Sequence, residues 1–126
     1  MKLLLLRWLA VGFAGFAGAL ARYWIGSAIG RLPMRFPLGT LVINVSGSLF
    51  LGWFLAYAVD RQISDTTKLA IATGFVGAYT TFSTFVYESS VLADEKAWLE
   101  MTMNVVGSVV LGLMAVRLGM FIARRS

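Results

Sequence analysis

The sequence predicts an all-α integral membrane protein with four transmembrane helices in a single domain, residues 1–126. Hydrophobic residues make up 59% of the chain and charged residues only 13%. The apolar residues form long blocks separated by short charged stretches, a pattern typical of membrane-spanning helices. The chain has no cysteine and no histidine, which excludes disulfides and removes the commonest metal ligand and general base.

Four apolar blocks, at about residues 3–30, 38–59, 69–92 and 98–122, are each long enough to cross a bilayer, which takes about 20 residues. The connections are short, so consecutive helices should be antiparallel neighbours. Basic residues gather at the block ends, where they suit anionic lipid headgroups better than nucleic acid. Their distribution favours cytoplasmic termini only modestly: Lys2, Arg7, Arg61, Lys68, Arg124 and Arg125 on the side of the termini, and Arg31, Arg35 and Lys96 on the other.

The first block has the general form of a secretory signal, a basic residue followed by leucines and then small residues. Two features favour a retained helix instead. Arg7 interrupts the apolar run, and Gly12, Gly15 and Gly18 recur at a spacing that lets another helix approach closely. Near the far end, Arg22 either snorkels to the headgroups or holds a partner inside the bundle. From its position alone, snorkelling is the simpler interpretation.

The second block carries a small, polar face. Its members recur at three- and four-residue spacing: Thr40, Asn44, Gly47, Ser48 and Leu51. The amide of Asn44 is costly in lipid, so it should face protein or water. A hydrogen bond to a neighbouring helix and a place on a polar pathway explain Asn44 equally well.

The third block should be broken in mid-membrane. Gly74 and Gly77 weaken the helix, and a dense run of hydroxyls and phenylalanines follows at residues 80–85. A break inside a bilayer survives only where it is buried in protein or lines a polar cavity, and such breaks often mark ion sites.

The fourth block again has polar and small residues on one face: Asn104, Ser108 and Gly112.

The candidate chemistry is that of a pathway and not of an enzyme. There is no nucleophile–base pair, phosphate-binding loop or metal-ligand cluster. Glu88 lies late in the third block, and the other acids lie in or beside loops. Phe82 and Phe85 are three residues apart and so lie on one side of a helix. Because aromatic rings are positive at their edges, the two rings could coordinate a small, hard anion. From spacing alone, packing is the favoured interpretation of both rings.

Three motifs together resemble the Fluc family of fluoride channels, also called CrcB. They are GFAGALAR at Gly15–Arg22, GTLVINVSGS at Gly39–Ser48 and GFVGAYTTFSTF at Gly74–Phe85. The resemblance implies a fluoride-selective ion channel, multi-pass in a bacterial inner membrane, that lets fluoride leave the cell passively and protects against its toxicity.

The resemblance also implies an antiparallel, dual-topology homodimer with two pores. A structural sodium ion at the dimer centre would be held by the backbone carbonyls of Gly77 and Thr80, and Arg22 matches the family's first-helix arginine, here assigned to the vestibule. One departure is the pair Ala78 and Tyr79, where the family pattern has glycine and a smaller apolar residue, so the shape of the break is open. The residues assigned to the fluoride pathway are Thr40, Asn44, Thr81, Phe82, Ser83, Thr84, Phe85, Glu88 and Ser108.

Two other classes of protein share some of these features. A small multidrug exporter also has four helices and dual topology, but it needs an acid within its first helix for proton coupling. The first block here contains no Asp or Glu. An accessory membrane subunit without transport of its own would not need the polar helix faces, although polar contacts between helices could mimic them.

Overall fold

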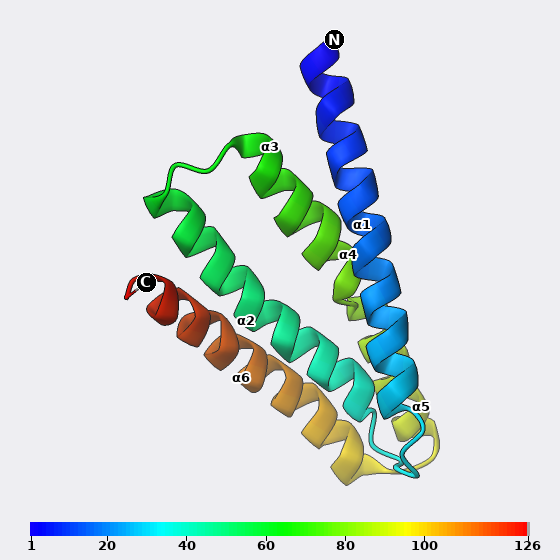
Figure 1. The fold of residues 1–126 in the computed structure, drawn as a ribbon. Coiled ribbons are helices and arrows are strands. Elements are labelled where there is room, and N and C mark those ends of the chain that lie inside the picture. The colour runs from blue at the N-terminus through cyan, green and yellow to red at the C-terminus, as the bar shows by residue number, and fades with distance from the viewer. Residues whose placement is uncertain (126) are drawn as a thin grey trace.

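Four long helical segments dominate the computed structural model, which describes residues 1–125 (Figure 1). Each is long and apolar enough to cross a membrane: Lys2–Ile29, Leu38–Asp60, Asp65–Asp94 and Trp98–Ala123. No strand occurs among the described residues. In order, the helices are α1 (Lys2–Ile29), α2 (Leu38–Asp60), α3 (Asp65–Lys68), the π-helix η1 (Leu69–Val76), α4 (Gly77–Tyr79), α5 (Phe82–Asp94) and α6 (Trp98–Ala123).

The helices pack mainly as two pairs. Helix α2 lies along α6, while α1 lies along η1 and α4. Figure 1 shows that the two pairs diverge toward the end of the molecule that carries both termini. At the opposite end the two loops meet, since Arg35 Nη2 lies 2.9 Å from Glu95 Oε2. The α5 segment, which contacts both α2 and α6, closes that end.

Glycines set how closely the paired helices approach. A Cβ atom added to Gly18 would collide with the carbonyl oxygen of Phe75 on η1. A Cβ atom on Gly119 of α6 would likewise collide with the carbonyl oxygen of Leu49 on α2. The glycines predicted to admit a neighbouring helix were Gly12, Gly15 and Gly18. Only Gly18 requires the absence of a side chain, because a Cβ on Gly15 would make ordinary contact and nothing lies within 4 Å of one on Gly12.

The third span differs from the predicted one in where it starts and in how its first half is wound. It begins at Asp65, earlier than the expected start near residue 69, because the Ser64 hydroxyl caps it by accepting a hydrogen bond from the Thr67 N–H at 3.2 Å. Its residues Leu69–Val76 are wound as a π-helix. Such segments are rare and are often found at functional sites.

Few large side chains are buried within the chain, and many large apolar side chains face outward. Phe13, Trp24 and Phe82 are 75%, 79% and 77% exposed. Apolar surface of this extent requires lipid or another protein chain to cover it.

Candidate functional site

The helix of the third span stops at Tyr79 and restarts at Phe82. Between them, Thr80 (φ −79°, ψ 158°) and Thr81 (φ −148°, ψ 114°) have extended backbone. The side-chain oxygen of Thr81 then caps α5 by accepting a hydrogen bond from the Thr84 N–H at 3.2 Å. The interruption therefore exposes backbone polar groups at two helix ends, and each needs a partner.

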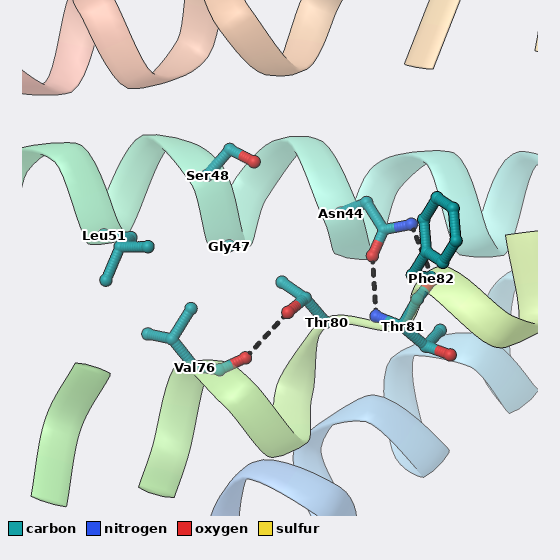
Figure 2. A pocket seen from close by; sticks show the side chains of 8 residues that line it. All are labelled: Asn44, Gly47, Ser48, Leu51, Val76, Thr80, Thr81 and Phe82. Carbon is teal, nitrogen blue, oxygen red and sulfur yellow. Dashed lines mark hydrogen bonds between the residues drawn. The ribbon is translucent and has the colours of Figure 1, made fainter. Parts of the chain in front are cut away.

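Asn44 on α2 supplies two of those partners. Its Nδ2 donates to the Thr81 carbonyl at 3.0 Å, and its Oδ1 accepts from the Thr81 N–H at 2.8 Å. Figure 2 shows the amide aimed at this backbone segment. Asn44 thus makes a hydrogen bond to a neighbouring helix, which was one of the two roles predicted for it. One N–H of the amide still has no partner in these two bonds, so the residue retains a donor for a ligand.

Thr80 is held by its own helix. Both its N–H and its Oγ1 donate to the Val76 carbonyl, each at 2.9 Å. Its carbonyl faces Arg22 of α1, whose Nη1 lies 3.5 Å away. The first-helix arginine therefore reaches into the bundle and does not only extend toward the headgroups.

A pocket of about 240 Å³ opens beside the interruption (Figure 2). The polar face predicted for the second block contributes Asn44, Gly47, Ser48 and Leu51 to one wall. The third span contributes the other wall: Val76, Thr80, Thr81 and Phe82. The pocket is thus bounded by an amide, hydroxyls, the backbone of the interruption and an aromatic ring.

The two phenylalanines lie next to each other. The ring centroids of Phe82 and Phe85 are 5.8 Å apart and the ring planes are inclined by 47°. Phe82 lines the pocket, whereas Phe85 does not. The exposure of Phe82, at 77%, means that the ring adds little to the packing of a single chain.

The hydroxyls after the interruption form a small cluster. Thr81 Oγ1 donates to Thr84 Oγ1 at 3.0 Å and lies 3.4 Å from Ser83 Oγ. Thr81 is 7% exposed, whereas Ser83 and Thr84 are exposed. The first hydroxyl therefore shapes the start of α5, and the other two remain accessible.

A second pocket, of about 310 Å³, lies on the α1 side of the same segment. Its polar lining residues are Arg22, Tyr23, Ser27, Thr40, Thr81 and Thr84. Thr40 Oγ1 also donates to Glu88 Oε1 at 2.8 Å. The other carboxyl oxygen of Glu88, Oε2, is buried without a hydrogen-bond partner in the chain.

The fourth span contributes a buried network apart from both pockets. Asn104, which is fully buried, donates from Nδ2 to Ser89 Oγ at 3.0 Å, and Ser89 Oγ donates to the Phe85 carbonyl at 2.8 Å. Ser108 Oγ is 3.5 Å from Asn104 Oδ1, so Ser108 joins this network and lines neither pocket. Sequence reasoning overlooked Ser89, although its position four residues after Phe85 is suited to such a bond.

Sequence reasoning also overlooked Ser46, whose Oγ lies 2.8 Å from the hydroxyl of Tyr79. Ser46 belongs to the second motif, but the polar face was defined by other positions. Tyr79 was recognised only as a departure from the family pattern.

Backbone oxygens at the interruption are candidate ligands for a cation. Among residues 1–125, no three His, Cys, Asp or Glu side chains lie close enough together to hold a metal ion. In a continuous helix the Thr81 N–H would donate to the Gly77 carbonyl, but here it donates to Asn44. The Gly77 carbonyl has therefore lost its helical donor, and an oxygen of this kind fits a hard cation.

The four apolar spans define a multi-pass helical membrane protein, and the interrupted third span gives it a polar site. Residues 9–120 match the family model described as CrcB-like protein, Camphor Resistance (CrcB). The chain belongs to the CrcB family.

Several relatives carry the name fluoride-specific ion channel FluC. The Campylobacter lari protein is 41% identical over 115 residues, which cover 90% of this chain and 94% of that protein. FluC 3 of Methanosarcina barkeri is 43% identical over 116 residues, 91% of this chain and 88% of the relative. A Methylococcus capsulatus relative is 45% identical over 118 residues, 92% of this chain but only 52% of its own length. The matched part of this chain thus spans about half of that last protein.

Proposed function

We propose that the protein is a fluoride-selective ion channel that lets fluoride leave the cell passively and so protects against fluoride toxicity. The observation that carries the proposal is membership of the CrcB family over residues 9–120, a match that includes the whole interrupted span. Relatives that match most of their length to this chain are named fluoride-specific ion channels. The proposed activity is conduction, not catalysis.

The pocket beside the interruption offers suitable ligands for a small anion. The free N–H of Asn44 and the hydroxyl of Ser48 are hydrogen-bond donors on its wall, and the hydroxyls of Ser83 and Thr84 follow on α5. The edge of the Phe82 ring carries partial positive charge without a fixed cation. Thr40, Thr81, Phe85, Glu88 and Ser108 complete the proposed pathway, with Arg22 at its vestibule.

The conducting unit is proposed to be an antiparallel homodimer with two pores. Phe82 lines the pocket and is nevertheless 77% exposed, so one chain leaves the path uncovered on that side. A second copy in inverted orientation would cover it. Tag-accessibility assays on intact and permeabilised cells test this arrangement and should detect the termini on both sides of the membrane. Termini found on one side alone would rule it out.

The interruption is proposed to lie in mid-membrane, in a bacterial inner membrane. Thr80 and Thr81 fall at the middle of the 30-residue third span, Asp65–Asp94, which supports this depth. The carbonyls of Gly77 and Thr80 are proposed to hold a sodium ion at the dimer centre. The freed carbonyl of Gly77 supports such a site, and Arg22 would compete with the ion for the Thr80 carbonyl.

Fluoride efflux from proteoliposomes, followed with a fluoride electrode, tests the function. Purified protein should release fluoride down its electrochemical gradient and pass chloride poorly. Fluoride movement that required an imposed proton gradient would replace the channel by a coupled carrier. No fluoride movement in correctly assembled protein would favour an accessory subunit.

A further inference from the structure

Tyr79 is the last residue of α4 and lies directly before the interruption. Although its side chain ends in a hydroxyl, it is only 8% exposed. The hydroxyl lies 2.8 Å from Ser46 Oγ on α2. Ser46 Oγ donates its single hydrogen to the Ile43 carbonyl at 3.2 Å. Either hydroxyl of the pair can donate, and where Ser46 Oγ donates to the Ile43 carbonyl the Tyr79 hydroxyl donates to Ser46.

Two further contacts hold the ring of Tyr79. On one side, the ring of Phe75 lies parallel to it, with centroids 6.0 Å apart and planes inclined by 9°. On the α2 side, a Cβ atom added to Gly47 would lie 3.2 Å from Tyr79 Cδ1 and would collide with the methyl group of Thr80. The missing side chain at Gly47 thus lets α4 approach α2 closely enough for the hydrogen bond to Ser46.

Helix α2 consequently holds the third span at both ends of the interruption. Ser46 binds the side chain of Tyr79 before it, and Asn44 binds the backbone of Thr81 after it. Thr80 lies between the two attachments. We propose that Tyr79 is a positioning residue, which with Ser46 fixes the end of α4 against α2 and so keeps the interruption in one geometry.

The expected effect of Tyr79 on conduction rests on the proposed channel function, whereas its structural role does not. Its structural part is measured without fluoride, by hydrogen exchange of the backbone amides in the assembled protein. Tyr79→Phe removes the hydroxyl and retains the ring. Tyr87→Phe is the matched control, because Tyr87 is 70% exposed on α5.

Tyr79→Phe should accelerate amide exchange in the peptide that covers residues 80–84 by about five-fold, while exchange in α6 stays unchanged. Ser46→Ala should have the same local effect, and the double variant should be no faster than either single variant, because both remove one bond. Ser46→Thr, which keeps a hydroxyl able to bond the preceding helical turn, should exchange like the unsubstituted protein.

Fluoride efflux per dimer should fall in Tyr79→Phe and Ser46→Ala and be retained in Tyr87→Phe and Ser46→Thr. Unchanged local exchange in Tyr79→Phe, or additive effects in the double variant, would overturn the positioning role. So would accelerated exchange throughout the protein, which indicates a general loss of stability. If Tyr79→Phe fails to assemble, Ser46→Ala and Ser46→Thr decide the question. Altered exchange in a protein that never transports fluoride would count against the proposed function and leave the positioning role intact.

Discussion

The amide of Asn44 pairs with both backbone polar groups of one residue, Thr81, at 3.0 and 2.8 Å. The arrangement resembles one rung of a β-ladder, with a side chain in the place of the second strand. It satisfies an N–H and a carbonyl that the helix interruption would otherwise leave unpaired. Asn44, which lines the pocket, therefore fixes the backbone and retains one further N–H.

Asn44→Ala should destabilise the protein as well as abolish fluoride efflux. It leaves two backbone groups of Thr81 without partners, at a cost of about 1–3 kcal/mol for each buried group. Thermal unfolding of the detergent-solubilised protein measures the loss. Ser48→Ala is the matched control for stability, because Ser48 lines the same pocket and makes no hydrogen bond with the described residues. Equal melting temperatures for the two variants would contradict the role of Asn44 at the interruption.

Phe82→Ile should reduce fluoride efflux severely and leave the folded dimer in place, and Phe85→Ile should do the same. Isoleucine fills comparable volume but has no ring edge with partial positive charge. If the rings only pack, efflux persists and the substitution costs typically about 1 kcal/mol of stability.

The measurement for these phenylalanine variants is efflux per dimer, with assembly checked by size-exclusion chromatography. Phe13→Ile serves as the control, since Phe13 is 75% exposed on α1. Normal efflux in both pocket variants would assign the two rings to packing.

Gly18→Ala should separate α1 from η1, and Gly12→Ala should not. A Cβ on Gly18 collides with the Phe75 carbonyl oxygen, whereas nothing lies within 4 Å of one on Gly12. Overpacking of this kind costs about 1–3 kcal/mol. Thermal unfolding should show a lower midpoint for Gly18→Ala alone. Equal midpoints would mean that the two helices adjust without cost.

Exchange of sodium for a bulky organic cation should weaken the dimer. The proposed ligands are backbone oxygens of Gly77 and Thr80, so Thr80→Ser should have a mild effect. The fraction of dimer after rigorous sodium removal, measured by single-molecule photobleaching in liposomes, checks this. Undiminished dimerisation and transport without sodium would eliminate the site.

Hydropathy alone was sufficient to locate the four spans, because their apolar blocks exceed the length needed to cross a bilayer. The clustered threonines likewise identified the segment that leaves helical geometry at Thr80 and Thr81. The π-helical winding of Leu69–Val76 could not be predicted, since an apolar run has no polar face to reveal its period.

Contacts between distant residues were beyond sequence reasoning as well. The bond from Thr40 to Glu88 spans 48 positions, and the bond between Ser46 and Tyr79 spans 33. Each depends on how α2 lies against the third span, which the local pattern of either segment does not determine. The family motifs included Ser46 and Tyr79 but gave no indication that the two residues meet.

The pairing of Asn44 with Thr81 also has a consequence for biosynthesis. Asn44 precedes Thr81 by 37 positions, so the ribosome delivers α2 before the third span emerges. A segment with unpaired backbone groups would be costly to release from the translocon into lipid. Here the residue that compensates those groups has been synthesised first, so the interrupted span can acquire its partner as it leaves the translocon.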